Sequence, residues 1–165
     1  MSLSSVIRAS SADLSGLVGA FGAVAERSFF AFAEPADSVA SETAMTEWLG
    51  GEPYVATVSF RGPRSGAVSI VVPETLAREL TSAFLGLDFE SEAEVEETAV
   101  CDLVGEMANM ATGSWLSSLE AEQVFELAHP EVSRAQGNSE RGPWAVVLVN
   151  GTPTGLCCEF TGGRS

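Results

Sequence analysis

Residues 91–119 read SEAEVEETAVCDLVGEMANMATGSWLSSL, and this stretch decides the fold that we expect. Ser91 is followed three residues later by Glu94, which is the spacing of an N-terminal capping box. No proline follows before Leu119, so the segment predicts one long helix. Its apolar residues form one broad arc, the expected core face, which comprises Val100, Leu103, Val104, Met107, Met110 and Ala111.

A second face of this helix carries a polar stripe. Its members fall within about 60° of one another around the helix axis and are Asp102, Glu106, Asn109 and Gly113. A solvated surface is the ordinary interpretation of such a stripe. Asn and Gly are poor residues for a helix interior, however, and Gly costs about 1 kcal/mol relative to Ala. Close approach of another molecule would explain Gly113, and Asn109 would then reach into that molecule.

The chemistry available to this stripe is positioning. A carboxamide does not titrate near neutral pH, but its donors and acceptor can orient a water molecule. Phosphoryl transfer is a reaction in which positioning supplies much of the catalysis. Glu106 has no arginine on its own face and is left to pair with a cation from outside. The stripe therefore predicts half of an active site, which a partner completes.

The N-terminal part of the chain predicts a helix and then a loop. Apolar residues recur at helical spacing over about residues 11–31, which favours an amphipathic helix over a signal peptide. Ser11 or Asp13 is the expected N-cap. Residues 33–41 contain Pro35 and are expected to form a loop.

The other predicted elements are short and bounded by turn residues. The expected strands are residues 54–60, 66–72, 123–128, 144–149 and 156–160. Pro73 opens a helix that continues to Leu85, and residues 131–141 are expected to form a polar loop. The turn at 61–64 and the Asn150-Gly pair predict two hairpins. This order predicts one α+β domain in which long helices cover one face of a mostly antiparallel sheet.

Composition excludes several classes of function. The net charge is −15, and all eight basic residues are arginine. Without lysine, a Schiff-base or phosphate-loop lysine is impossible. The acidic balance disfavours nucleic acid and acidic membrane surfaces as partners. No apolar run is long enough to cross a membrane.

Three cysteines and one histidine limit the remaining chemistry. The odd count, with Cys157 next to Cys158, favours reduced thiols in a cytoplasmic protein over a disulfide framework. Cys101 is the third, and no zinc-like spacing links these residues to His129. His129 precedes Pro130 at a strand end, where a structural role is expected.

On the long helix the sequence resembles the CheC/CheX/FliY family of chemotaxis phosphatases. The family signature is Asp or Ser, three residues, Glu, two residues, Asn and a more distant Pro. Here those positions are Asp102, Glu106, Asn109 and Pro130. The segments EMANMATG at 106–113 and PEV at 130–132 are also similar to those of the family. The order of elements over about 50–160 follows the family as well. With one motif, the chain is most similar to CheX, which implies a single CheX-like domain over residues 1–165.

The resemblance implies a phosphatase of a phosphorylated response regulator similar to CheY. Glu106 would bind the active-site lysine of the regulator, and Asn109 would orient the water that hydrolyses its phospho-aspartate. Asp102, Gly113 and Pro130 would complete the partner surface. The resemblance places Mg2+ on the regulator and no cofactor on this chain. Two alternatives stay open: a non-catalytic module that binds a regulator or flagellar-switch component, and a structural domain with a solvated stripe.

A homodimer is expected from both the resemblance and the strand count. A lone sheet of about five strands leaves two edges with unpaired backbone groups. The final strand, residues 156–160, is apolar except for Glu159 and is a candidate edge. Pairing about a two-fold axis would leave both copies of Asn109 exposed. Trp115 lies toward the apolar arc and is expected in the core or in the dimer contact.

Overall fold

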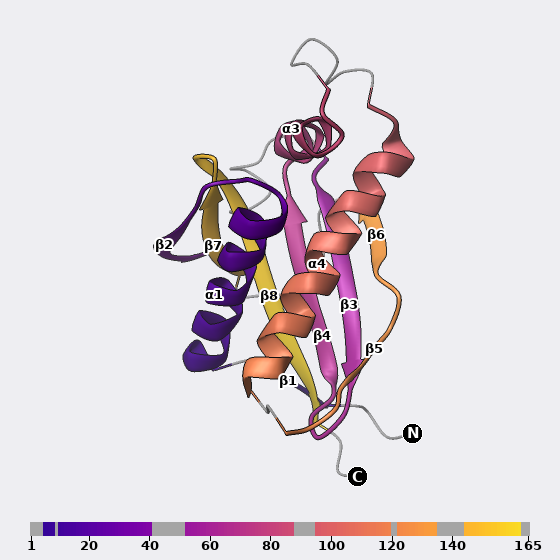
Figure 1. Cartoon of the computed structure of the whole chain (residues 1–165). Coiled ribbons are helices and arrows are strands. Elements are labelled where there is room, and N and C mark those ends of the chain that lie inside the picture. Colours follow the sequence, from indigo (N-terminus) through magenta and orange to yellow (C-terminus); the bar gives the residue numbers. More distant parts are fainter. Residues whose placement is uncertain are drawn as a thin grey trace.

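The computed structural model describes residues 5–8, 10–40, 52–87, 95–119, 122–134 and 144–162 (Figure 1). Its helices are α1 (Ser11–Ser28), α3 (Glu74–Phe84) and α4 (Glu97–Leu119). Its strands are β1 (Ser5–Arg8), β2 (Ala33–Ala40), β3 (Tyr54–Arg61), β4 (Gly66–Val72), β5 (Glu126–Leu127), β6 (Glu131–Arg134), β7 (Trp144–Val149) and β8 (Thr152–Gly162). In these ranges, no helix is long and apolar enough to cross a membrane.

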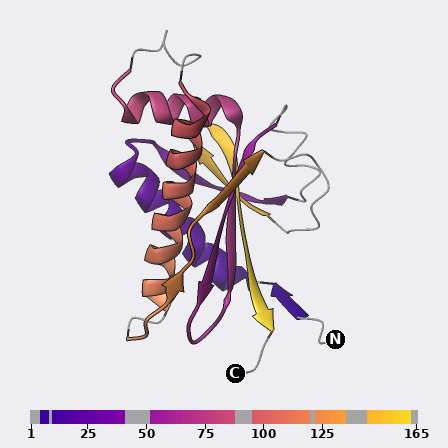
Figure 2. The same cartoon turned by 90° about the vertical axis from the view of Figure 1, so that its right-hand side faces the viewer.

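The strands form one antiparallel sheet, and the helices cover one of its faces. The strand order is β2-β7-β8-β4-β3-β5, with β1 also pairing with β8 and β6 also pairing with β3. Figure 2 shows α1, α3 and α4 on the same side of this sheet. The predicted α+β architecture is confirmed.

The core lies between the sheet and the helices, and α4 supplies much of it. All but one of the predicted arc residues are buried, and Met110 is half-buried. Trp115 is 0% exposed and packs its ring about equally far from Phe60 and Phe160, at 6.1 and 6.0 Å between centroids. The expected core role of Trp115 is confirmed. The Ser91 capping box itself lies outside the described residues, but the predicted start of the long helix there was wrong: Val95 and Glu96 are not helical, and α4 begins at Glu97.

The N-cap of the first helix lies one residue before the nearer of its two predicted positions. Ser10 is the N-cap, because its Oγ accepts a hydrogen bond from the Asp13 amide at 3.1 Å. The Asp13 carboxylate accepts one from the Ser10 amide at 3.2 Å. This reciprocal pair is a capping box, so Asp13 takes part as its third helical residue and not as the cap. The expectation of Ser11 or Asp13 was wrong in position.

Both predicted hairpins are present. Strands β3 and β4 pair from Tyr54 with Val72 to Phe60 with Gly66. The β7–β8 turn consists of Asn150 and Gly151, with φ angles of 51° and 80°. Two consecutive positive φ values are what a tight two-residue hairpin turn requires. Strand β8 therefore starts at Thr152, earlier than predicted.

Two segments that were expected to be loops form edge strands. Strand β2 occupies most of the predicted loop 33–41 and pairs with β7, with a register shift between Pro35 and Val39. Edge strands tolerate proline because one side of the backbone has no strand to bond. Strand β6 lies in the predicted loop 131–141 and pairs with β3. The strand predicted at 123–128 is reduced to β5.

The final strand is not an edge of the sheet. Strand β8 pairs with β4 on one side and with β7 and β1 on the other. Its two cysteines point to opposite faces: Cys158 belongs to the main core, and Cys157 belongs to a second apolar cluster with Trp144 and Val146. Burial raises the pKa of Cys158 to about 12, so its thiol stays protonated at neutral pH.

Candidate functional site

The predicted stripe lies on the accessible side of α4. Asp102 and Glu106 are exposed, and Asn109 and Gly113 are half-buried. Among the described residues, none forms a hydrogen bond or ion pair with the side chain of Asp102, Glu106 or Asn109. The polar groups of these three side chains are therefore available to a partner.

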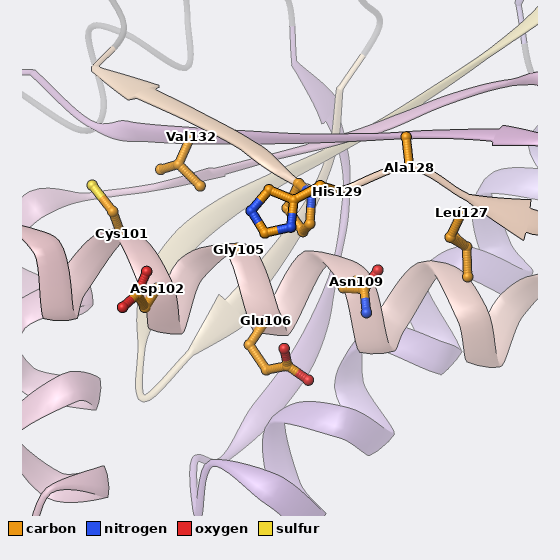
Figure 3. Close-up of a pocket in the computed structure, with 10 residues that line it drawn as sticks. Cys101, Asp102, Gly105, Glu106, Asn109, Leu127, Ala128, His129 and Val132 are labelled. Carbon is orange, nitrogen blue, oxygen red and sulfur yellow. The ribbon is translucent and has the colours of Figure 1, made fainter.

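A groove of about 650 Å³ runs along this face of α4 (Figure 3). The helix forms one wall. The opposite wall is the connection from β5 to β6 and the start of β6. The lining residues from that wall are Leu127, Ala128, His129, Pro130 and Val132. The groove thus brings Asp102, Glu106, Asn109 and Pro130 together, although Pro130 is far from the helix in sequence.

Gly105 of α4 lets this wall approach the helix closely, whereas Gly113 only lies beside it. A Cβ atom built on Gly105 would lie 3.3 Å from Val132 Cγ2 and 3.4 Å from Pro130 Cβ, which is tighter than usual packing. A Cβ atom on Gly113 would lie 3.7 Å from Leu127 Cδ1. The chain itself therefore occupies the space beside Gly113, which does not line the groove. Sequence reasoning passed over Gly105, although a glycine in the middle of a helix was its signal.

His129 is a groove residue that sequence reasoning assigned only a structural role. Its side chain is exposed, and Figure 3 shows the ring turned toward α4 in the same groove as Asp102 and Glu106. The family signature extends from the stripe to the neighbouring Pro130 but gives His129 no role. Only the pairing of β5 and β6 with β3 places it there.

A network of four charged side chains and one tyrosine fixes one end of the groove. It comprises Tyr54, Glu74, Arg78, Glu97 and Arg134 and joins β3, α3, the first residue of α4 and the last residue of β6. Arg134 contacts Glu97 at 3.1 Å and Glu74 at 3.0 Å. Arg78 contacts both carboxylates at 3.3 Å. Because α4 and β6 are tied to the same groups, the two walls are held in register at this end.

Tyr54 is the buried member of the network. Its hydroxyl donates a hydrogen bond to Glu97 Oε2 at 2.7 Å, and the Arg134 guanidinium lies 4.2 Å from its ring centroid. Burial, and then the hydrogen bond to Glu97, raises the pKa of Tyr54 to about 12. The same hydrogen bond lowers the pKa of Glu97 below its ordinary value, so Glu97 is ionised at neutral pH.

The groove offers positioning groups and no evident metal cage. The described residues contain no group of three or more His, Cys, Asp or Glu side chains that would hold a metal ion. Cys101 also lines the groove, but burial raises the pKa of its thiol and disfavours the thiolate. The arrangement can bind a cation through Glu106 and orient a water molecule through Asn109.

Comparison with solved structures identifies proteins that share this fold. A CheX protein from Desulfovibrio desulfuricans is 19% identical, with a TM-score of 0.66 over 90% of this chain and 99% of that one. A chemotaxis protein from Desulfovibrio vulgaris Hildenborough is 19% identical, with a TM-score of 0.68 over 93% and 99%. A Borrelia burgdorferi CheX, solved in a CheX–CheY–BeF3–Mg2+ complex, is 15% identical, with a TM-score of 0.58 over 89% and 96%. These likenesses show a shared fold.

The comparison with curated proteins gave no match. The family described as chemotaxis phosphatase CheX matches residues 54–143. This span is more than half of the chain and contains the whole motif from Asp102 to Pro130 as well as both walls of the groove. The chain belongs to the CheX family of chemotaxis phosphatases.

Proposed function

We propose that this chain dephosphorylates the phospho-aspartate of a CheY-like response regulator. One observation carries the proposal: Glu106 and Asn109 present unpaired polar groups, within the described structure, on one rigid helix at an open groove. Membership of the CheX family supports phosphatase activity. The Borrelia burgdorferi neighbour, solved with CheY, supports the class of partner.

Glu106 anchors the complex. The family resemblance implies that Glu106 binds the active-site lysine of the receiver. Its carboxylate is exposed and forms no ion pair with any described residue, so docking breaks no such ion pair. Asp102 lies one helical turn earlier and adds a second negative charge toward the same cation. Pro130 borders the contact from the opposite wall, and Gly113 marks its far end.

Asn109 positions the attacking water. The carboxamide oxygen accepts a hydrogen bond from the water, while the amide group has donors for a phosphoryl oxygen. The water oxygen bonds to phosphorus as the bond from phosphorus to the aspartate oxygen breaks, leaving the aspartate carboxylate and inorganic phosphate. The water proton passes to phosphate or solvent, since the carboxamide takes up none. Mg2+ belongs to the receiver in this scheme, where it neutralises phosphoryl charge.

Phosphate release from a phosphorylated receiver tests the proposal. We expect Asn109→Ala to lower the rate by about a hundredfold or more, because one lost positioning group costs that much in comparable sites. Binding of the receiver should change little. Ser114→Ala is the matched control, because Ser114 is an exposed residue of α4 outside the stripe and outside the groove.

Two results would contradict the proposal. Turnover by Asn109→Ala close to that of the wild type would remove the catalytic role of the carboxamide. A wild-type chain that binds phosphorylated receivers without speeding phosphate release would be a non-catalytic binding module of the same fold.

A further inference from the structure

A second groove lies on the other side of the Asp102–Glu106 face. It has a volume of about 350 Å³ and is lined by the residue that follows α1, by the last residues of α3 and by the first half of α4. Its lining is mostly apolar and includes Phe29, Thr81, Phe84, Leu85, Ala99 and Leu103. Asp102 and Glu106 line both grooves, so they form the ridge between them.

Two apolar residues that line this apolar groove are exposed, and two further exposed apolar residues lie close to its lining in sequence. Phe84 and Leu85 are 55% and 52% exposed, and Leu87 follows them in sequence at 44%. Phe30 is 79% exposed and directly follows Phe29, whose ring lies 5.8 Å from that of Phe84. Exposed apolar residues that are scattered need no explanation, whereas a contiguous group marks an interaction site.

Phe30 directly follows the C-cap of α1 and has a left-handed backbone conformation that costs free energy for a residue with a side chain. Its φ is 54°, in the left-handed region that disfavours residues with a side chain. The turn is held by the Ala25 carbonyl, which accepts hydrogen bonds from the amides of Phe29 and Ala31 at 3.2 and 3.0 Å. Glycine would adopt this conformation without strain, and a polar residue would avoid the exposed ring. An exposed aromatic side chain here is therefore better explained by contact with a partner.

We propose that the apolar groove, with the exposed side chains of Phe30, Phe84 and Leu85, is a second docking surface for the receiver. The inference rests on the proposed function. The surface is continuous with the partner site, because Glu106 lines both grooves. A receiver that places a cation on Glu106 lies over this groove and sets an apolar side chain, next to its cation, between α3 and the end of α1.

Charge makes such a surface useful to this chain. A net charge of −15 gives little long-range attraction to any partner that is not strongly basic. Apolar contact adds short-range affinity that salt does not screen. In this arrangement Asn109 supplies catalysis, while the apolar groove supplies affinity and selects receivers with a matching apolar side chain.

The test measures affinity and turnover separately. The probe is a receiver activated with beryllium fluoride, titrated calorimetrically against the full chain. We expect Phe84→Ser to raise Kd by about tenfold or more, while phosphate release at saturating receiver stays at the wild-type rate. Val124→Ser is the matched control, because Val124 is 84% exposed and lines neither groove. It should change neither quantity.

The Phe30→Gly variant separates loss of the docking surface from loss of folding. Glycine relieves the left-handed strain, so this variant should bind the receiver more weakly than the wild type without losing thermal stability. Wild-type Kd for both Phe84→Ser and Phe30→Gly would overturn the docking surface and leave the proposed function intact. A change in oligomeric state with unchanged receiver affinity would assign the groove to self-association and also overturn it. Failure of the wild type to bind or dephosphorylate any receiver would instead reject the proposed function.

Discussion

Glu106 and Asn109 share one face of α4, but their side chains differ in burial. Glu106 is exposed on the ridge between two grooves, where a long side chain can follow an approaching cation. Asn109 is half-buried beside the wall that contains Leu127 and His129. This partial burial leaves the Asn109 side chain less room than that of Glu106, which would suit its proposed role of holding a water molecule in one position.

Substitution of Glu106 should change affinity according to charge. If Glu106 pairs with a lysine of the receiver, Glu106→Lys should weaken binding more than Glu106→Gln, because it adds like-charge repulsion. Loss of one partner from a desolvated pair costs about 2–5 kcal/mol. Calorimetric titration with an activated receiver measures both variants. Equal affinity for the wild type and the two variants would show that this face docks no cation.

Tyr54 should titrate at unusually high pH. It is the only tyrosine of the chain, so tyrosinate absorbance reports this residue alone. Its pKa is raised to about 12 in the folded protein, against an ordinary value of about 10 in the unfolded chain. The unfolded state therefore ionises first, and the stabilisation is complete below pH 10 and lost as pH rises toward 12.

The measurement is a tyrosinate titration alongside denaturant unfolding at several pH values. The control is Tyr54→Phe, which removes the hydrogen bond to Glu97 and should remove this component of the pH dependence. A native titration midpoint near the ordinary tyrosine pKa would contradict the buried contact.

At the scale of elements, the connection from α1 to β2 combines strain with anchoring. Phe30 has a φ of 54°, and the next exposed aromatic, Phe32, donates its amide hydrogen to Asn150 Oδ1 at 2.8 Å. The Phe32 carbonyl accepts one from the Asn150 amide at 2.7 Å. The β7–β8 turn therefore fixes the chain just after the strained residue.

We expect Phe30→Gly to raise the free energy of unfolding by about 1 kcal/mol, because the left-handed conformation costs about that much for a residue with a side chain. Little packing is lost, since Phe30 is mostly exposed. Urea unfolding measures the change, and Phe32→Gly is the comparison variant at another exposed aromatic without a positive φ. Destabilisation by Phe30→Gly would mean that the ring packs onto the fold more than its exposure indicates.

Elements with strong local signals were predictable from sequence. The periodicity of α4 and the Asn150-Gly turn do not depend on distant residues, and both were correct. Strand β2 was missed because Pro35 is usually a sign of a loop, and only the edge position makes it acceptable. Strand β6 was missed because four residues carry too little alternation to be recognised. Pro130 was expected at the partner surface from the family resemblance alone. The rest of this groove wall, including His129, was missed, because pairing with β3 places it.

At the scale of the whole molecule, the sheet has two different edges. Strands β5 and β6 lie at one side and contribute to the wall of the groove that Asn109 lines. A dimer there would close over Asn109. At the other side of the described sheet, β2 is outermost beside β7 and the short β1 is outermost beside β8; pairing through β2 would leave both copies of the stripe open to receivers. The homodimer that we propose is therefore expected to use β2 and not the final strand.

This dimer should be weak and sensitive to dilution and salt. Pro35 and the neighbouring register shift interrupt the outer edge of β2, and both features limit strand pairing. Two chains also bring together twice the net charge of −15, a repulsion screened beyond about 8 Å at physiological salt. Sedimentation at micromolar concentration should give about twice the monomer mass of 17.2 kDa, with dissociation on dilution and tighter association as salt is raised. A monomer throughout this range, or hydrogen-exchange protection on dimerisation at Glu106 and Asn109 instead of β2, would contradict this assembly.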